Sequence, residues 1–373
     1  MVTTALREVF LQPLGIYVIA LGAGFLIPLF DRAHRGSAIL VFLAALACMT
    51  GIAAFNLLAI INGAPPIDIE TAGIAPPFSI NLRFGLFEGG FVLAVNSVAL
   101  LAAWHYLPAL RQHASALLLY LIMVMGINGM VMTRDLFNLF IFIEITSIAT
   151  YALIGMERTG SVLAAGFKYI IATSIASAFF LLGTIFIYYQ TGTLNIDDII
   201  VHRELINGPV GLIATLFVLT SLLVELKPYP ANGWGLDVYE TAHSGIASLI
   251  SVGVSAGVLF AVYKVLPLMN GYLPSIALIG GMTFLVSNLV GLKQDNAALE
   301  PLNRRGPRPL PFRKADWNSV RVAWIDGRIN VSLNDELVYQ RPVDQPDAAT
   351  FGLYRDSRDS QARVRNVVMT GNW

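Results

Sequence analysis

The sequence comprises 373 residues, of which 56% are hydrophobic and only 13% are charged, and its mean hydropathy is +0.67. This composition is typical of a membrane protein rather than of a water-soluble domain. Basic and acidic residues balance at 24 each, and we expect no nucleic-acid partner.

The charges divide the chain into two parts. Residues 1–292 contain 11 basic and 14 acidic residues, whereas residues 293–373 contain 13 and 10. This division predicts a membrane-embedded part followed by a part built for water, with a boundary near Lys293.

Cysteine and histidine usage limits the chemistry. The single cysteine, Cys48, excludes an intrachain disulfide and a cysteine-ligated iron–sulfur cluster. The five histidines are scattered without a metal-binding spacing. We therefore expect no metal and no cofactor in this chain, so any redox chemistry would belong to partner subunits.

Apolar stretches predict nine transmembrane helices. The first is interpreted as a membrane span rather than a cleaved signal peptide, because no small-residue cleavage pattern is present. The loop after the second span contains four prolines and predicts an extended or hairpin segment at the membrane surface. The expected spans are 13–30, 36–61, 85–107, 114–133, 135–155, 162–189, 209–227, 244–267 and 273–292.

The fifth expected span carries Glu144 near its middle. A charged side chain at that depth costs about 2.5–3.5 kcal/mol to insert, so it should face protein or water. Ser147 and Tyr151 follow on the same helical face and extend a polar stripe. Glu144 is either a structural carboxyl bonded to a neighbouring helix or a residue of a proton or ion pathway.

Two lysines lie within later spans. Lys168 is about two turns into the sixth span, where it can snorkel to the interface or approach the side of the bundle that carries Glu144. Lys264 lies close to the end of the eighth span and is predicted to be an interface anchor.

Residues 224–243 predict a discontinuous helix. Glu225 and Lys227 are followed by Pro228 and Pro230, which remove backbone donors and disfavour helix at the preceding residue. Broken helices at membrane depth mark ion sites in transporters. The alternative is an ordinary helix end at which Lys227 solvates the terminal carbonyl groups.

Four segments resemble the antiporter-like membrane subunits of respiratory complex I, of Mrp-type cation/proton antiporters, and of membrane-bound hydrogenase and formate hydrogenlyase complexes. They lie within roughly residues 80–296 and read MTRDLFNLFIFIEITSIATYALIG, AAGFKYIIATSIASAFFLLG, KPYPANGWGLDVYETAHSGIASLIS and NLVGLKQDN. The resemblance implies a polytopic helical fold and a subunit that moves protons through buried Glu and Lys residues. In that family a fifth-helix glutamate pairs with lysines on following helices, which implies this role for Glu144 and Lys168.

The resemblance is less direct further along the chain. When PANGW is matched to the family's PFHxW, Glu225 takes the position of the usual seventh-helix lysine, and Lys227 lies two residues away across the break. The usual eighth-helix lysine falls near Ala256. This leaves Lys264, and His243 just ahead of that helix, as further candidates for proton transfer.

The C-terminal part departs from the family pattern. Residues 297–314 form a basic, proline-rich linker, and residues 315–373 alternate like strands. Asp326-Gly327 predicts a hairpin turn, and further strands are expected around Phe351 and Val364. This segment resembles the closing strands of concanavalin-like jelly rolls and is expected to form a partial β-sheet.

The sequence thus predicts an all-α polytopic membrane protein of about nine helices, one of them discontinuous, with a small C-terminal β segment. Residues 1–296 form the expected antiporter-like domain. The leading hypothesis is a redox-centre-free subunit of a proton- or sodium/proton-translocating respiratory or hydrogenase-type complex in the inner (cytoplasmic) membrane. Its expected partners are other membrane subunits, lipid, and protons or sodium ions.

The alternative is a non-transporting membrane anchor, or a truncated fusion remnant with a peripheral interaction module. Two observations favour it: the eighth helix lacks its usual lysine, and the family's second set of helices does not follow residue 296.

Overall fold

The computed structural model divides the chain into two compact units, Met1–Ser287 and Asn288–Trp373, each of which is described by itself. The structure describes residues 11–71, 73–74, 79–157, 159–227, 232–283, 318–325 and 328–342.

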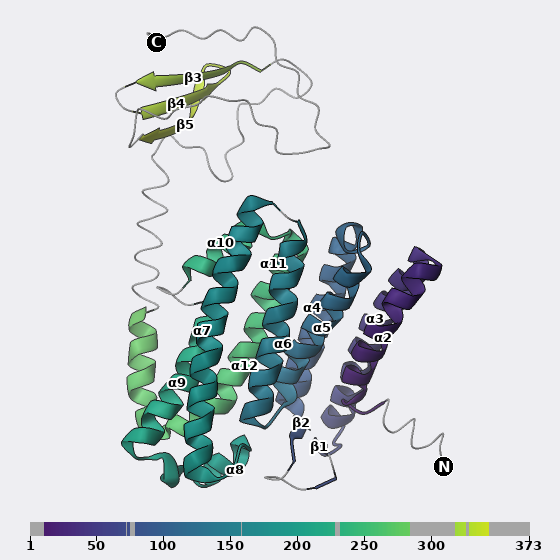
Figure 1. Ribbon diagram of the computed structural model, residues 1–373, viewed down its shortest axis with the longest axis vertical. Helices are drawn as coiled ribbons and strands as arrows, with labels where there is room; N and C mark the ends of the chain where they lie inside the picture. Colours follow the sequence, from purple (N-terminus) through teal and green to yellow (C-terminus); the bar gives the residue numbers. More distant parts are fainter. Residues whose placement is uncertain are drawn as a thin grey trace. The chain divides into compact units, whose positions relative to one another are not determined.

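The first unit is a bundle of long apolar helices (Figure 1). Eight described stretches are long and apolar enough to cross a membrane. The helices are α2 (Gly15–Ala33), α3 (Arg35–Ile61), α4 (Leu86–Leu110), α5 (Ala114–Met132), α6 (Leu136–Ile154), α7 (Gly160–Thr191), α9 (Pro209–Leu226) and, within the eighth stretch, α11 (Ser244–Ser248) and α12 (Ser255–Val265). Short helices α8 (Ile196–Val201) and α10 (Gly233–Thr241) flank α9 in the chain.

The predicted fold class is confirmed: the chain is a mostly helical, multi-pass membrane protein with a small antiparallel sheet near its C-terminus. The ninth expected span, 273–292, begins with the helix Leu273–Thr283, and residues 284–292 lie outside the described part of the chain. The expected break after the seventh span is present, since α9 ends at Leu226 and the next described helix begins at Gly233.

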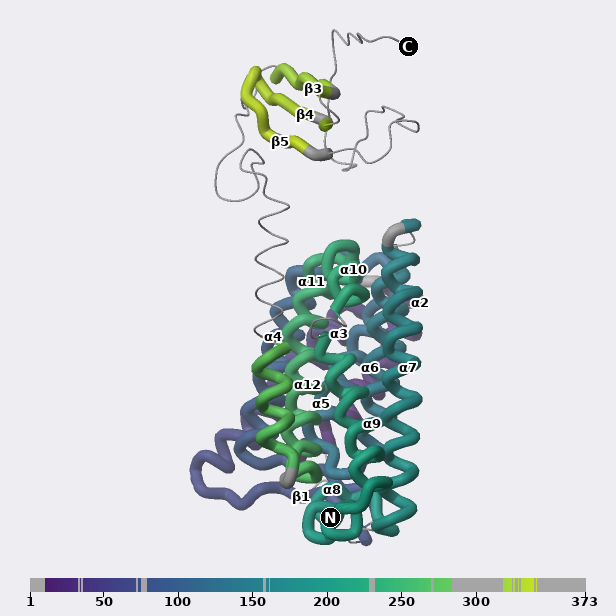
Figure 2. Tube along the Cα trace, turned by 90° about the vertical axis from the view of Figure 1, so that its left-hand side faces the viewer, coloured from purple at the N-terminus to yellow at the C-terminus, as the bar shows by residue number. Residues whose placement is uncertain are grey.

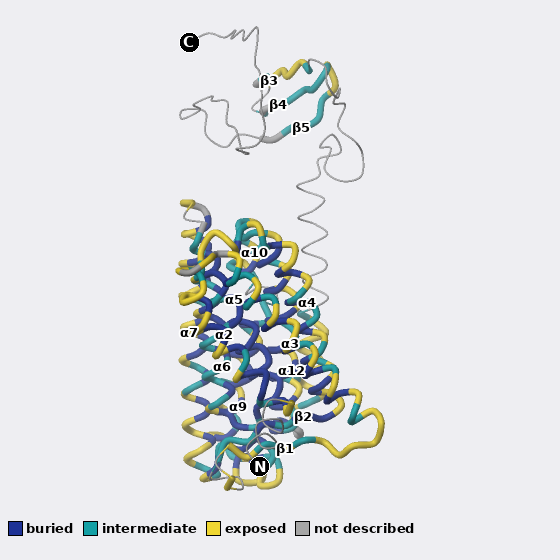
Figure 3. The backbone as a smooth tube through the Cα atoms, turned by 90° about the vertical axis from the view of Figure 1, so that its right-hand side faces the viewer, coloured by how far each residue is buried: buried dark blue, intermediate teal, exposed yellow. Residues whose placement is uncertain are grey.

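Helix α5 packs against α2, α3, α4, α6 and α12, and Figure 3 shows that the inside of the bundle is buried. Inside the protein 78% of the α5 span is buried, against 39% for α3 and α7, which expose broad apolar faces. Asn96 of α4 and Asn128 of α5 are fully buried and exchange side-chain hydrogen bonds of 2.8 and 3.2 Å. Each amide thereby satisfies the other in a region without water.

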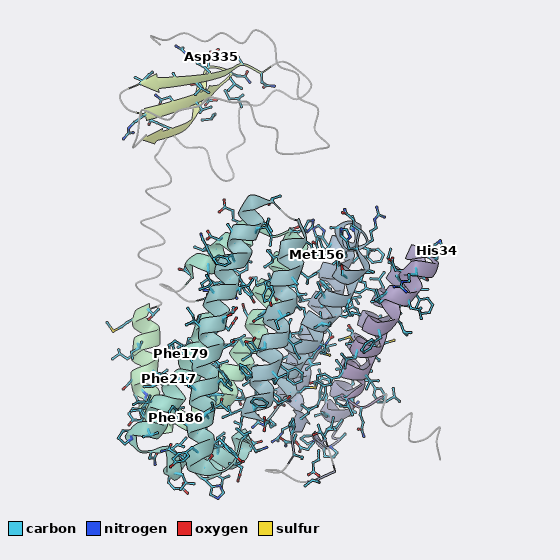
Figure 4. The ribbon with its side chains drawn as sticks, in the orientation of Figure 1. His34, Met156, Phe179, Phe186, Phe217 and Asp335 are labelled. Carbon is cyan, nitrogen blue, oxygen red and sulfur yellow. The ribbon has the colours of Figure 1, made fainter. Side chains whose placement is uncertain are left out.

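Helices α7 and α9 pack closely against each other. Phe179 of α7 and Phe217 of α9 contact through rings whose centroids are 5.3 Å apart (Figure 4). On the same pair of helices, a Cβ added at Gly183 would lie 2.4 Å from the backbone oxygen of Ala214. Glycine at 183 therefore permits the approach of the two backbones.

The eighth span contains a feature that the sequence pattern did not predict. Residues Leu249–Val254, between α11 and α12, form a π-helical segment. Such segments widen a helix by one residue per turn and often occur at functional sites. This segment packs against α4 and α5. Ile127 of α5 lies beside Gly253 of the segment and beside Gly257 of α12.

The two ends of the bundle carry different connections. Strands β1 (Ile67–Glu70) and β2 (Asn81–Phe84) pair antiparallel, which confirms the hairpin expected in the proline-rich loop. This hairpin and α8 lie at one end of the bundle, and α10 and α11 lie at the other (Figure 1 and Figure 2).

The described part of the second unit is a three-stranded antiparallel sheet in the order β3-β4-β5. Its strands are β3 (Val320–Ile325), β4 (Arg328–Leu333) and β5 (Glu336–Pro342), with a register shift at Val331/Ser332. Ile325 pairs with Arg328, as expected for a hairpin, although the turn residues themselves are not described. The expected linker 297–314 and the strands expected near Phe351 and Val364 also lie outside the described residues.

We predict that Gly183→Ala lowers the free energy of unfolding by about 1–3 kcal/mol, because the added methyl group overpacks the α7–α9 contact. Gly166→Ala is the matched control in the same helix, because an added Cβ there meets nothing within 4 Å. The control should be neutral or slightly stabilising, since alanine is the better helix former. Thermal unfolding in one detergent measures both variants, and equal stability would contradict the packing argument.

Candidate functional site

Glu144 lies on α6 and is partly buried against α7. The hydroxyl group of Ser177 on α7 donates a hydrogen bond to Oε1 of Glu144. Ser147, one turn further along α6, is buried, and Tyr151 is half-buried. The polar stripe of α6 therefore faces protein rather than lipid, as its spacing predicts.

Glu225 is the most deeply buried acid of the site, with only 2% of its surface exposed. It lies in the last turn of α9. Its Oε1 atom has no hydrogen-bond partner among the described residues. Glu144 and Lys227 both lie close enough to interact electrostatically with its carboxyl group. The structure therefore brings three of the predicted charged residues within electrostatic reach of one another, on α6 and at the end of α9, and α7 packs against both of these helices.

Lys227 ends α9 in a left-handed backbone conformation, with φ 59° and ψ 44°. The following residue is proline, which disfavours a helical conformation at Lys227 and explains why α9 stops there. Its Nζ atom donates to the backbone oxygen of Glu225 at 3.0 Å and lies 5.3 Å from the ring centroid of Trp234. The expected solvation of a terminal carbonyl by this lysine is therefore present, and it coexists with an electrostatic interaction with the Glu225 carboxyl group.

Two aromatic residues complete the site and were not predicted from the sequence. Tyr169 of α7 and Trp234 of α10 form an edge-to-face pair with centroids 5.1 Å apart. The Tyr169 hydroxyl lies beside Ser147 and Thr150 of α6. This hydroxyl and the Trp234 Nε1 atom, like Glu225 Oε1, are buried without a hydrogen-bond partner in the described part of the chain. Their positions in the sequence could have identified them, because Tyr169 directly follows the candidate Lys168 and Trp234 ends the PANGW segment of the broken helix.

Lys168 does not pair with Glu144. Its Nζ atom lies 2.5 Å from Oδ2 of Asp237 on α10, and the two side chains are 60% and 38% exposed. Helix α10 packs against α7 and supplies this acid, which the reasoning from adjacent helices could not foresee. The ammonium group thus lies at the exposed edge of the site, as the snorkelling alternative expects.

Lys264 was predicted to anchor the eighth span at the interface, and this prediction is wrong. Only 2% of the residue is exposed. Its Nζ atom donates to the backbone oxygens of Met130 at 2.6 Å, Val131 at 3.2 Å and Thr133 at 2.6 Å. Helix α12 packs against α5, whose last carbonyl groups have no partner within their own helix. Lys264 therefore caps the C-terminus of α5.

His243 caps the start of α11. Its Nδ1 atom accepts a hydrogen bond from the backbone N–H of Gly245 at 3.2 Å, and its ring lies 4.2 Å from that of Tyr106 between centroids. Neither contact joins it to Glu225 or Lys227. Among the described residues, no group of three or more His, Cys, Asp or Glu side chains is arranged to hold a metal ion.

We predict that Lys264→Met destabilises the bundle, because three buried carbonyl groups lose their donor. Leaving a buried polar group unsatisfied costs about 1–3 kcal/mol. Lys168→Met is the control, since an exposed ion pair contributes about 0–1 kcal/mol. Thermal unfolding of the two variants should show the larger loss at position 264, and the reverse order would contradict the capping role.

Two family matches divide the chain. Residues 133–297 match the family described as NADH:quinone oxidoreductase/Mrp antiporter, transmembrane. Residues 287–373 match a domain of unknown function, DUF1583_N. The first match contains the candidate residues from Glu144 to Lys264.

Curated relatives resemble the helical part. The NADH-quinone oxidoreductase subunit N of Desulforudis audaxviator is 31% identical over 254 residues, which cover 66% of this chain and 50% of the relative. A Na(+)/H(+) antiporter subunit of Bacillus subtilis is 29% identical over 205 residues, covering 54% and 41%. The chain spans about half the length of such relatives.

Solved structures agree with these matches. A chain of the archaeal membrane-bound sulfane sulfur reductase is 30% identical with a TM-score of 0.64, covering 67% of this chain and 52% of that one. A chain of the Mrp complex from Dietzia is 26% identical with a TM-score of 0.61, covering 69% and 48%. Residues 133–297 therefore belong to the NADH:quinone oxidoreductase/Mrp antiporter transmembrane family, and the helical part as a whole is similar to antiporter-like membrane subunits.

Proposed function

We propose that this chain is a membrane subunit of a proton- or sodium/proton-translocating complex of the respiratory or hydrogenase type. In this proposal the subunit resides in the inner membrane beside other membrane subunits, which supply any redox centres. The observation that carries the proposal is the buried Glu225 carboxyl, which has an unpartnered oxygen and lies within electrostatic reach of Glu144 and Lys227.

A buried acidic side chain in this position lowers the stability of the protein, which favours a functional role over a structural one. A charged group in the bilayer interior carries a penalty of several kcal/mol, and buried polar atoms are nearly always hydrogen-bonded. In a structural role, Glu225 would be expected to have a bonded partner for each oxygen. A proton-transfer group instead needs a free lone pair that can accept a proton or a bridging water molecule.

The contacts between these residues support an order of proton-transfer groups along a path. The exposed Lys168–Asp237 pair lies on α7 and α10, next in sequence to Tyr169 and near Trp234. Trp234 contacts both Tyr169 and the Lys227 ammonium group, so the aromatic pair links the neighbourhood of the outer charge pair to Lys227. We propose that protons pass between the outer pair and Glu225 by way of the Tyr169 hydroxyl and bridging water. The Trp234 N–H, which only donates, would orient that water, and Glu144 with Ser177 would continue the path.

Successive proton-transfer groups along such a path are coupled electrostatically. Each proton transfer changes the charge beside the next group, and a change of charge in a partner subunit can act on these groups in the same way. Here an acid occupies the usual lysine position, and Lys227 supplies the positive charge from across the helix end. In the proposed path the acid, Glu225, therefore stands where the family has its lysine, and Lys227 follows it in the chain.

The alternative, a non-transporting membrane anchor, has observations in its favour. Lys264 caps α5, His243 caps α11, and the position near Ala256 offers no titratable group. These findings remove Lys264 and His243 from the proposed pathway, which is left with the residues on α6, α7, α9 and α10 and at the end of α9. They leave the Glu144–Glu225–Lys227 group without an explanation in an anchor.

We predict that Glu225→Gln and Glu144→Gln each reduce proton translocation by about tenfold or more, because glutamine cannot exchange a proton. The assembled complex in proteoliposomes, with a pH-sensitive dye as readout, measures this. Glu204→Gln is the matched control on an exposed loop helix. Assembly is followed by size-exclusion chromatography. Undiminished translocation by assembled complexes of both variants would favour the anchor.

A further inference from the structure

A polar cavity of about 330 Å³ lies at the end of the bundle that carries the β1–β2 hairpin and α8. Arg83 of β2, Arg134 just ahead of α6 and Lys264 of α12 line it, together with the acid Glu88 of α4. None of these groups belongs to the proposed proton path. The cavity is therefore a separate feature of the molecule.

Most of the charges around the cavity are already engaged. The Arg134 Nε atom donates to Asp197 at 2.9 Å, Lys264 caps α5, and Glu88 accepts the Gly85 backbone N–H at 3.1 Å. Arg83 is the exception. It faces the exposed Asp68 across the hairpin register, yet its guanidinium forms no ion pair or hydrogen bond with any described residue.

Arg83 is the group that favours an anion. The lining holds three basic side chains, Arg83, Arg134 and Lys264, and one acidic one, Glu88. Asp197 is taken up by Arg134, whereas the exposed Asp68 opposite Arg83 forms no ion pair with it among the described residues. Arginine is suited to phosphate because its planar donors bind two oxygens at once. The unpaired guanidinium of Arg83 can therefore bind a phosphate group at the mouth of this cavity.

An apolar hollow of about 440 Å³ adjoins the polar one, and Phe87 and Tyr263 line both. It lies between α4 and α12 and is also lined by Phe91, Leu259 and Phe260. Phe91 is about one turn further into α4 than Phe87, and Leu259 is about one turn further into its span than Tyr263. The apolar hollow therefore lies on the side of the membrane interior, and the polar cavity lies at the helix ends.

From this arrangement we infer that the two hollows bind one anionic phospholipid, with its phosphate on Arg83 and an acyl chain between α4 and α12. The order from polar to apolar along the helices is that of a lipid leaflet. A free phosphate ion would leave the apolar hollow unused. This inference is independent of the proposed function, because the site could hold lipid in a transporting or a non-transporting protein.

The test uses the full-length chain, purified and delipidated, with added dioleoylphosphatidylglycerol, dioleoylphosphatidylcholine or inorganic phosphate. Native mass spectrometry counts bound lipid, and thermal unfolding measures protection. We expect one tightly held phosphatidylglycerol with clear preference over phosphatidylcholine. Arg83→Gln should weaken its binding about tenfold, as expected for losing a charge-assisted hydrogen bond. Arg111→Gln, at the other end of α4, is the matched control and should bind like the unmodified chain.

A second variant separates lipid from other occupants. Leu259→Trp should fill the apolar hollow and weaken phosphatidylglycerol binding, whereas the response to inorganic phosphate should not change. The inference is overturned if both lipids bind equally, if Arg83→Gln and Arg111→Gln behave alike, or if inorganic phosphate protects as well as the lipid does. Cross-linking of a photoreactive residue at position 259 to a polypeptide instead of a lipid would also overturn it.

Discussion

The absence of water inside a bilayer is the constraint on which this structure depends. Every buried polar group must find a partner within the protein. The central helix α5 shows how this is achieved: Asn128 exchanges hydrogen bonds with Asn96, and Lys264 supplies donors to the last carbonyl groups of the helix. These contacts fix the positions of α4 and α12 around α5, and the other helices pack on this group with their apolar faces toward lipid.

The candidate site is one place where that constraint is not fully met; Tyr17, Thr184 and Gln190 elsewhere in the bundle also have a buried polar atom without a partner among the described residues. Glu225 Oε1, the Tyr169 hydroxyl and Trp234 Nε1 are all buried, and none has a hydrogen-bond partner in the described part of the chain. They gather where α9 ends at Lys227 and α10 begins. Buried polar networks of this kind stabilise a protein only when they are complete. Their position beside two acids and a lysine is the physical reason for the proposal that this region moves ions.

Sequence reasoning succeeded where a residue's surroundings follow from its own helix. The apolar spans, the hairpin near Arg83 and the end of α9 before Pro228 all depend on local composition and on proline chemistry. It failed for the interface position expected of Lys264 and for the pairing expected between Lys168 and Glu144, because the partners of these lysines come from elements distant in sequence. Asp237 is 69 residues from Lys168, and the Met130 carbonyl is 134 residues from Lys264. Snorkelling arguments treat a lysine as alone on its helix, whereas packing gave each of these lysines a specific partner.

By itself the sequence determined that this is a multi-pass membrane protein, which residues are costly to bury, and where the seventh span must break. An apolar stretch favours a membrane span and a proline ends a helix whichever helices pack beside it. Only the tertiary structure decided that Glu225, Lys227 and Glu144 form one group, that Lys264 is a cap, and that Arg83 faces a cavity beside an apolar groove. These outcomes depend on which helix faces contact one another, and side-chain spacing along a single helix does not carry that information.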